Sequence, residues 1–407
     1  MNLALLLQGK GWDGAKNLVR APMSPTPSPS PEREGSLALY IHWPFCVSKC
    51  PYCDFNSHVR AAVDQEHWRA ALLADLTHEA ERLPHRRLTS IFFGGGTPSL
   101  MPPATVAALI EAACTYWPAD PNIEITLEAN PSSVEAARFA DLAAAGVNRV
   151  SLGLQSLDDE TLRFLGRAHG VCEGLAALDT AQAEFARVSF DLIYALPGQS
   201  VNAWRRELTR ALAFGTGHLS LYQLTIEPGT RFATLLARGE LAPPDPDLGA
   251  DLFALTREMT EAAHVPAYEI SNHARAGEES RHNLSYWRYR DYAGIGPGAH
   301  GRRCGARTQR HRKPENWLAA VGARGHGIAE EEALANRERA TEALLMGLRL
   351  AEGIDLDRDD LDYATMIDRR AVDRLARQGL LAEHGHRLSA TPAGMPVLDA
   401  ILAEIAL

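Results

Sequence analysis

The chain alternates between two hydrophobic patterns over residues 37–270. Short β-rich apolar runs are separated by stretches whose apolar residues recur at helical spacing, such as Trp68, Leu72 and Leu76. The runs predicted to be strands are Leu37–Trp43, Ser90–Phe93, Ile123–Glu128, Arg149–Leu154, Val188–Leu196 and Leu219–Leu224. Six strand–helix repeats with short connections predict an α/β fold, in which helices cover a parallel sheet. The repeats fit an open or partial barrel as well as a doubly wound sheet, and in both architectures ligands gather where the strands end.

The alternation stops at residue 271. Residues 271–313 are rich in His, Arg, Gly and aromatic side chains and show little periodicity. From Asn336 the pattern is helical again, residues 384–386 form a predicted hairpin turn between two β-rich runs, and a final helix is expected from Met395. Two helices and a hairpin resemble a winged-helix module. The 15 acidic and 9 basic residues from Glu331 to the C-terminus favour packing or protein contact over DNA binding.

Composition and charge narrow the classes of function. Hydrophobic residues make up 46% of the chain and charged residues 23%, which is usual for a globular protein. The net charge of −10 argues against nucleic-acid binding, because that requires basic surface facing the phosphates. No apolar run approaches about 20 residues, so no membrane span is expected. Residues 1–35 lack the pattern of a secretory signal and carry alternating prolines, which predicts a disordered Pro/Ser-rich leader.

Three of the six cysteines are clustered. Cys46, Cys50 and Cys53 fall within eight residues, directly after the first predicted strand. Clustered thiols in a chain without an export signal indicate metal binding and a reducing, cytoplasmic location. The other three cysteines are expected to be small buried hydrophobic residues. They are Cys114, Cys172 and Cys304.

The C-x3-C-x2-C spacing of the clustered cysteines favours an iron–sulfur cluster. Thiolates are the usual cluster ligands, and their close spacing lets one loop wrap around a cubane. Three ligands for four irons leave one iron open to a small molecule. The competing hypothesis is a structural zinc site, which needs four protein ligands and would take His42 or His58 as the fourth.

Glycine and polar residues mark the ends of the later predicted strands. Phe93 is followed by three glycines, Thr97 and Pro98, a run that exposes backbone groups and admits a ligand closely. Each polar residue by itself could be an ordinary satisfied side chain, but together they predict a ligand site at the strand ends. These residues are Glu128 and Gln155, which close the third and fourth predicted strands, and Asp191, which lies within the fifth; Arg167 is added to this set.

The stretch from Tyr40 to Phe55 resembles the radical S-adenosylmethionine superfamily, whose hallmark is this cysteine spacing at this place. The resemblance implies a partial (βα)6 barrel of the radical S-adenosylmethionine type. It also implies a [4Fe–4S] cluster on Cys46, Cys50 and Cys53, with S-adenosylmethionine on the iron that no thiolate covers. In that superfamily the cluster donates the electron that cleaves the sulfonium and generates a 5′-deoxyadenosyl radical.

From Leu37 to the C-terminus the chain resembles a narrower family, the oxygen-independent coproporphyrinogen oxidases and their HemW-type relatives. The resemblance implies that a set of residues contacts S-adenosylmethionine, at one of two sites. These residues are Tyr40, Gly95, Glu128, Gln155, Arg167 and Asp191, with further contacts from Tyr52, Gly96 and Thr97.

Two features favour the HemW-type branch. The oxidases carry a fourth cysteine two residues after the third, where this chain has Phe55. Residues 282–287 match the H-N-x-x-Y-W motif of the HemW-type haem chaperones. A neutral imidazole is a good axial ligand for haem iron, so His282 is the candidate ligand, with Tyr286 and Trp287 packing on the macrocycle. The alternative for His282 is a structural histidine in a polar loop.

Four arginines follow this motif and are candidates to pair with haem propionates, although such charge runs are usually solvated. They are Arg302, Arg303, Arg307 and Arg310.

The sequence therefore predicts a haem chaperone that holds a [4Fe–4S] cluster, S-adenosylmethionine and haem, and passes haem to an acceptor protein. The alternatives are a coproporphyrinogen III oxidase and a structural zinc protein. The expected organisation is a leader (1–35), a radical S-adenosylmethionine core (36–270), a segment covering haem and cofactor (271–335) and a mostly helical, winged-helix-like domain (336–407).

Overall fold

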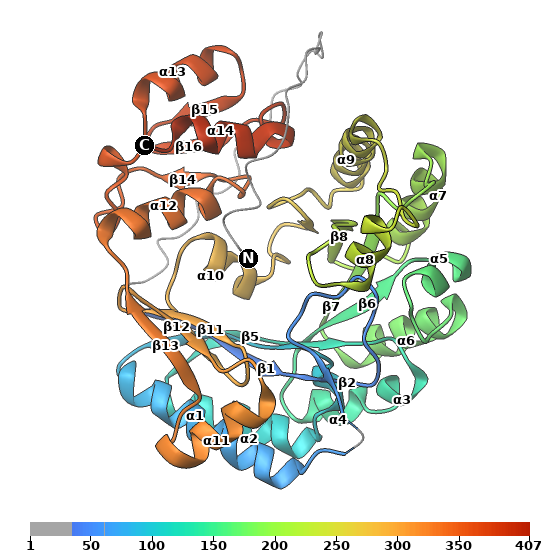
Figure 1. Cartoon of the computed structure of the whole chain (residues 1–407), viewed down its shortest axis with the longest axis vertical. Helices are drawn as coiled ribbons and strands as arrows, with labels where there is room; N and C mark the ends of the chain where they lie inside the picture. Colours follow the sequence, from blue (N-terminus) through green and yellow to red (C-terminus); the bar gives the residue numbers. More distant parts are fainter. Residues whose placement is uncertain (1–34, 61) are drawn as a thin grey trace. The chain divides into compact units, whose positions relative to one another are not determined.

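The computed structural model describes residues 35–60 and 62–407, which form two compact units. One unit spans Leu37–Ala335, and the other contains Asn336–Leu407 (Figure 1). The predicted leader lies almost entirely outside the described residues.

The larger unit is built on an eleven-stranded sheet with the order β13-β12-β11-β10-β1-β4-β5-β6-β7-β8-β9. Its centre contains all six predicted strands, and β4 to β8 pair in parallel. The predicted α/β class with a parallel-rich, partial-barrel sheet is therefore confirmed. The six strands are β1 (Ser36–Trp43), β4 (Arg87–Gly95), β5 (Ala119–Ala129), β6 (Arg149–Gln155), β7 (Arg187–Tyr194) and β8 (His218–Gln223).

Sequence reasoning missed five strands in the segment 271–335. Strand β10 joins the sheet parallel to β1, β11 to β13 continue antiparallel from it, and β9 pairs antiparallel with β8 at the other edge. This segment therefore extends both edges of the central sheet. The strands are β9 (Asn272–Ala274), β10 (Tyr292–Ile295), β11 (His300–Arg303), β12 (Ala306–Arg310) and β13 (Ile328–Ala333).

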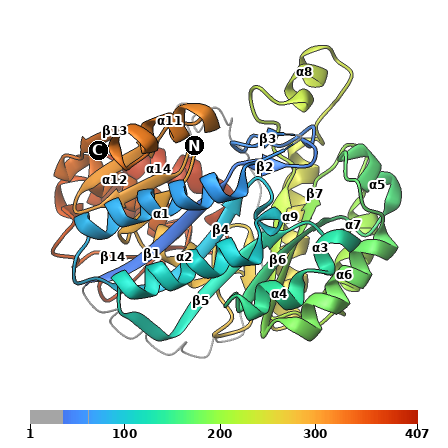
Figure 2. The same cartoon turned by 90° about the horizontal axis from the view of Figure 1, so that it is seen from below.

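Most of the helices that connect the strands cover the outer face of the sheet, whereas α10 packs against β4 on the concave face (Figures 1 and 2). Several begin at a side chain that caps the first turn, such as Asp64 before α1 and Ser200 before α7. The helices are α1 (Gln65–Arg82), α2 (Pro103–Tyr116), α3 (Ser133–Ala136), α4 (Phe139–Ala144), α5 (Asp159–Phe164), α6 (Val171–Glu184), α7 (Val201–Leu212), α8 (Arg231–Ala237), α9 (Pro246–Ala262), α10 (Arg281–Trp287) and α11 (Pro314–Arg324).

The two faces of the central strands differ in polarity. Successive side chains of a strand point to opposite faces, so Leu37, Leu39 and Ile41 of β1 belong to the buried core under the helices. The intervening Tyr40 and His42 face the concave side. Polar side chains follow on that face of the neighbouring strands: Ser90, Thr126, Glu128, Arg149, Ser151, Ser189, Asp191, His218 and Ser220.

The smaller unit contains the predicted helices and hairpin. Strands β15 and β16 pair antiparallel around the turn, and the short β14 adds a third strand. Asp368 accepts hydrogen bonds from the amides of Arg370 and Ala371 and so begins α13. The elements are α12 (Asn336–Gly347), β14 (Ile354–Asp355), α13 (Arg369–Arg377), β15 (Leu381–His384), β16 (Arg387–Ala390) and α14 (Leu398–Ile405).

No helix within residues 35–60 and 62–407 is long and apolar enough to cross a membrane.

The expectation that the isolated cysteines are buried is wrong for two of them, because Cys172 and Cys304 are exposed. Cys172 lies in the first turn of α6 and Cys304 lies between β11 and β12, positions that face solvent.

Candidate cluster and cofactor site

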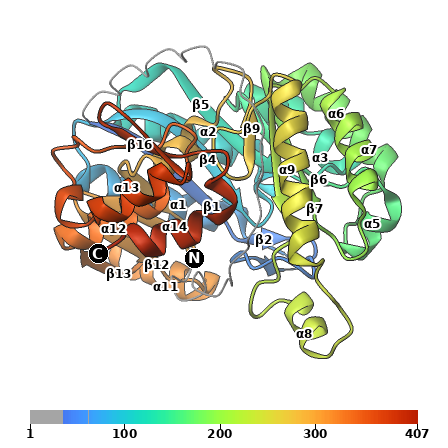
Figure 3. The same cartoon turned by 90° about the horizontal axis from the view of Figure 1, so that it is seen from above.

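The cysteine loop leaves the end of β1 and is braced at both ends. Strand β2 (Phe45–Cys46) pairs in parallel with β3 (His58–Val59), so the loop between them is closed at its base. The amide of Phe232 in α8 donates to the Pro51 carbonyl at 3.0 Å, which places α8 beside the loop (Figures 2 and 3). All three thiols are half-buried.

Hydrogen-bond donors surround the sulfur atoms. Thr97 Oγ1 donates to Cys46 Sγ at 3.4 Å, and Arg167 Nη1 donates to Cys50 Sγ at 3.4 Å. Burial raises the pKa of the Cys46 and Cys53 thiols. A thiolate, not a thiol, is the ligand of a metal, and donors to sulfur stabilise its negative charge. Thr97 and Arg167 would therefore stabilise Cys46 and Cys50 as metal-bound thiolates.

Asn130 links two of these donors and was missed in the sequence analysis. Its Nδ2 donates to Thr97 Oγ1 at 3.1 Å, while Arg167 Nη2 donates to Asn130 Oδ1 at 2.6 Å. A continuous chain of hydrogen bonds thus runs from Cys46 to Cys50 through the ends of β4 and β5. Asn130 directly follows β5, so the strand-end rule that selected Glu128 could also have selected it.

The glycines after Phe93 pack against the chain itself. Gly95 has a φ of +116°, and a Cβ there would lie 2.6 Å from the His42 ring. A Cβ on Gly96 would lie 2.7 Å from the carbonyl oxygen of Phe45. The close approach that these glycines allow is therefore used by the chain itself, because β1 and β2 pack directly against this turn.

Two carboxyl groups lie deep on the concave face of the sheet. Gly95 N–H donates to Glu128 Oε2 at 3.2 Å, and Ser151 Oγ donates to Asp191 Oδ1 at 3.2 Å. Burial, reinforced by the nearby Asp191, raises the pKa of Glu128 to about 8. Burial also raises the pKa of Asp191 to about 6. Both side chains keep some accessible surface, so a cationic ligand could reach them and would favour their ionised forms.

The remaining predicted cofactor residues surround these groups. Gln155 ends β6 in a left-handed conformation (φ +68°), which is uncommon for a non-glycine residue and often found at functional sites. Gln155 and Arg167 both lie against Gly153. Tyr40 shares a hydrogen bond of 3.0 Å with His42 Nδ1. Tyr52, in the cysteine loop, has its pKa raised by burial.

The candidate haem ligand is buried and fully hydrogen-bonded. His282 is 1% exposed, with Nδ1 3.0 Å from Ser90 Oγ and Nε2 2.7 Å from Tyr286 Oη. Its ring stacks on Phe92 at 4.9 Å between centroids, and burial lowers its pKa to about 3. The imidazole is therefore neutral, as ligation requires, but both nitrogens have partners. Trp287 is half-buried at the end of α10.

The four arginines considered for haem propionates all have partners within the protein. Arg303 pairs with Glu79 and Glu331, Arg310 with Asp75 and Glu79, and Arg307 with Glu332. Arg302 stacks on Tyr289 at 3.6 Å from the ring centroid. These contacts hold the added strands against α1 and each other. The expectation of solvated arginines is wrong for Arg302, Arg303 and Arg310, which are buried, and is met by Arg307, which is exposed.

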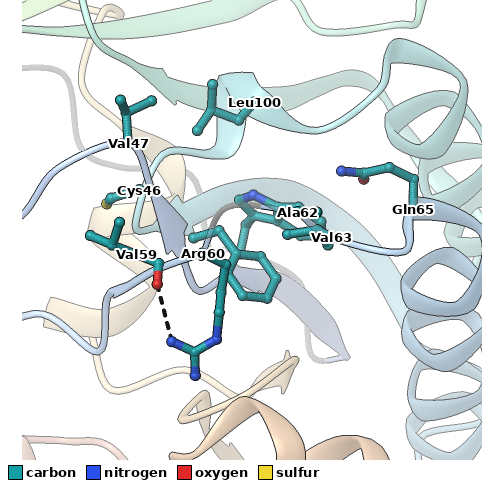
Figure 4. Close-up of a pocket in the computed structure, with 10 residues that line it drawn as sticks. Cys46, Val47, Val59, Arg60, Ala62, Val63, Gln65 and Leu100 are labelled. Atoms are coloured by element: carbon teal, nitrogen blue, oxygen red, sulfur yellow. Dashed lines mark hydrogen bonds between the residues drawn. The ribbon is translucent and has the colours of Figure 1, made fainter.

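A cavity of about 440 Å³ lies beside the start of the cysteine loop. Its lining is mostly apolar, with Val47, Val59 and Leu100 around it and Cys46 at its border (Figure 4). Arg60 also lines it and donates to the Val59 carbonyl at 3.1 Å (Figure 4).

The histidines required by the zinc hypothesis are engaged elsewhere. His42 uses Nδ1 towards Tyr40 and Nε2 towards the Asn56 carbonyl at 3.0 Å, and His58 Nε2 lies 3.3 Å from Asn56 Oδ1. Within the described part of the chain, no group of three or more His, Cys, Asp or Glu residues is arranged to hold a single metal ion. A cubane distributes its thiolates over separate irons, so three half-buried thiols on one loop fit it chemically.

Comparison with known proteins agrees with this arrangement. The model of the radical SAM superfamily matches residues 40–210, and that of the HemN C-terminal domain matches residues 334–397. "Radical S-adenosyl methionine domain-containing protein 1, mitochondrial" of Bos taurus is 41% identical over 98% of this chain and 94% of its own length. "Heme chaperone HemW" of Mycobacterium tuberculosis (strain ATCC 25618 / H37Rv) is 37% identical, covering 90% and 94%.

A solved structure has the same fold. Coproporphyrinogen III oxidase (HemN) from Escherichia coli aligns with a TM-score of 0.75 and 22% identity, covering 91% of this chain and 90% of its own. At that identity the likeness establishes fold alone. Family membership follows from the sequence relatives, and it implies a [4Fe–4S] cluster and S-adenosylmethionine as cofactors. The chain thus belongs to the radical SAM superfamily, in the group that carries the HemN C-terminal domain and includes proteins named heme chaperone HemW.

Proposed function

We propose that this protein is a haem chaperone, which binds haem and transfers it to an acceptor protein. The observation that carries the proposal is identity to proteins named heme chaperone HemW over nearly the whole chain. Phe55, where the oxidases have a fourth cysteine, supports the same choice. Its side chain is 61% exposed, so it fills no core position that would explain it by packing.

In this proposal Cys46, Cys50 and Cys53 hold the [4Fe–4S] cluster. When bound, the reduced cluster supplies the electron that cleaves the sulfonium of S-adenosylmethionine. Thr97 and Arg167 donate hydrogen bonds to the ligating sulfurs. The carboxylates of Glu128 and Asp191 attract the cationic groups of the cofactor. Its remaining contacts are assigned to Tyr40, Tyr52, Gly95, Gly96, Thr97, Gln155 and Arg167.

His282, Tyr286 and Trp287 are the proposed haem-binding residues. Because Nε2 of His282 is hydrogen-bonded to Tyr286, ligation requires that this contact open. Nδ1 would remain on Ser90, which would orient the ring as a partner on the second nitrogen commonly does. The acceptor protein is unidentified, and the thiols of the cluster loop require a reducing compartment such as the cytoplasm.

The deciding experiment is an anaerobic titration of reconstituted protein with haem and, in parallel, with coproporphyrinogen III. A haem chaperone gives a Soret shift with haem and transfers the haem to an apoprotein, while coproporphyrinogen stays unchanged. Formation of protoporphyrinogen without haem transfer would replace the proposal by the oxidase. A sample with one zinc and no cluster absorbance would overturn both.

A further inference from the structure

Arg149 is a buried arginine that lacks an ion pair within the described residues. It begins β6, faces the concave side of the sheet and is 2% exposed. Its one hydrogen bond is from Nη1 to Thr126 Oγ1 at 3.4 Å, a long contact to a neutral oxygen. A guanidinium is always charged, and a buried charge is stable only when an opposite charge or several hydrogen bonds compensate it.

The neighbouring strand provides a direct comparison. Arg187 of β7 is the register partner of Arg149 and forms ion pairs with Glu124 and Glu278, both at 2.8 Å. Burial acts to raise the pKa of Glu124, but Arg149 and Arg187 outweigh it and hold that pKa below its usual value. The nearby carboxylate is thus ionised and bonded to Arg187. The charge of Arg149 lowers this pKa even more than that of Arg187, but Arg149 makes no ion-pair contact with Glu124 within the described residues.

The concave face beside Arg149 is reached by solvent. Tyr40, Phe92, Glu128 and Asp191 are only half-buried, and Tyr222 of β8 is 40% exposed although it lies within the sheet. Asp191 contacts Ser151, two residues after Arg149 on the same face of β6. A ligand that enters this face could therefore approach the guanidinium.

We propose that Arg149 binds a carboxylate of a ligand held on the concave face. Its Nε and Nη2 form the edge that recognises a carboxylate with two parallel hydrogen bonds, and neither has a partner among the residues that the structure describes. Two ligands of the proposed function carry this group: haem, through a propionate, and S-adenosylmethionine, through its methionyl carboxylate. The assignment of this carboxylate to a haem propionate rests on the proposed function as a haem chaperone.

The test compares Arg149→Gln with Arg187→Gln in anaerobically reconstituted protein. Each variant is titrated with haem, with haem dimethyl ester, which lacks the propionate charges, and with S-adenosylmethionine. A propionate site predicts that Arg149→Gln weakens haem binding by about tenfold or more and leaves the ester unaffected. A methionyl site predicts the same loss for S-adenosylmethionine instead.

Melting temperatures separate these roles from a structural one. Arg187→Gln removes the ion-pair contacts to buried Glu124 and to Glu278 and should melt at a lower temperature. Arg149→Gln removes a buried charge that has no ion-pair contact, together with its attraction to Glu124, and should melt closer to the wild-type temperature than Arg187→Gln does. The proposal is overturned if Arg149→Gln binds both ligands like the wild type, or if it merely unfolds like Arg187→Gln. If the wild type binds no haem, the chaperone proposal fails while the S-adenosylmethionine titration still tests Arg149.

Discussion

The polar groups on the strands near the cysteine loop and those of the α10 region differ in how well the protein satisfies them. Near the loop, Glu128 and Asp191 have pKa values raised by burial to about 8 and about 6, so hydrogen bonds and nearby charges compensate their ionised forms only in part. At α10, His282 is neutral and hydrogen-bonded at both nitrogens. The first region gains stabilisation when a cation binds, whereas the second loses a contact when a ligand displaces Tyr286. A sequence motif shows which residues are candidates for a binding site. The protonation and hydrogen bonds of those residues show which interactions a ligand must form or break there.

The largest expected effect comes from the cysteine loop. Cys46→Ala should abolish cluster assembly, because three thiolates are the minimum that holds a cubane with one open iron. Iron and sulfide analysis with visible absorbance after anaerobic reconstitution measures it. Cys172→Ala, which removes an exposed cysteine of α6, is the matched control and should assemble a normal cluster. Equal iron content in the two variants would place the cluster elsewhere.

Much of this loop could be predicted from sequence, and the reason is physical. The spacing of Cys46, Cys50 and Cys53 constrains the ligands locally, and strand periodicity places the loop at a strand end. Asn130 and Arg149 were not recognised because their significance depends on distant partners. Asn130 matters because Thr97 and Arg167 converge on it, and Arg149 matters because Arg187 takes the nearby carboxylates.

Strands β9 to β13 were missed for a related reason. They have three to six residues each, and several are rich in arginine or glutamate instead of alternating apolar residues. Their arginines are held by Asp75 and Glu79 of α1 and by glutamates of β13, more than 20 residues away in sequence. No local pattern reveals such pairing.

The next largest effect is expected on the pH dependence of the affinity for S-adenosylmethionine, through Glu128. A cationic ligand needs the ionised carboxylate, so the affinity for S-adenosylmethionine should rise with pH up to about 8, by up to about tenfold per pH unit. Glu128→Gln should bind more weakly at pH 8 and lose this dependence. Isothermal titration between pH 6 and pH 9 checks it. A flat wild-type profile would contradict the role of Glu128.

The stability of the same variant has a definite sign. The pKa of Glu128 in the folded protein, about 8, lies above the ordinary value of about 4.3 expected in the unfolded chain. The folded state therefore holds this proton more tightly, and its stabilising effect is lost as pH rises from about 4.3 through 8. Glu128→Gln should melt above the wild type at pH 8 and near it at pH 4.

The α10 region should respond mainly in stability. His282→Ala should lower the free energy of unfolding by about 2–3 kcal/mol, because it opens a cavity and leaves Ser90 and Tyr286 without a partner. Tyr286→Phe should cost about 1 kcal/mol and release Nε2. If His282 ligates haem, Tyr286→Phe binds haem at least as tightly as the wild type and His282→Ala binds it more weakly. Equal haem affinity in all three proteins would leave this region a purely structural clamp.

The smallest expected effect belongs to a third kind of buried polar group. His273 of β9 is 2% exposed, and neither ring nitrogen makes a hydrogen bond of normal geometry within the described residues. Its ring nitrogens lack partners, as do Nε and Nη2 of Arg149, but its neighbour across the strand pair is Leu219, on the face of the sheet that packs under the helices. A ligand on the concave face does not reach that side, so the buried polar ring of His273 should only lower the stability of the fold. Burial lowers its pKa to about 3.

His273→Phe should therefore raise the free energy of unfolding by about 1 kcal/mol at pH 7, since burying a polar ring without partners is unfavourable. The folded pKa lies below the unfolded value of about 6.5, so His273 makes the wild type lose more stability than the variant as pH falls from about 6.5 towards 3, and the gap between the two proteins should widen. Thermal melts at pH 7 and pH 5 measure both effects. Haem and S-adenosylmethionine affinities should stay unchanged, because an unpartnered polar group marks a binding site only where a ligand can reach it. A variant that loses either affinity would show that the two faces of the sheet are not separated in this way.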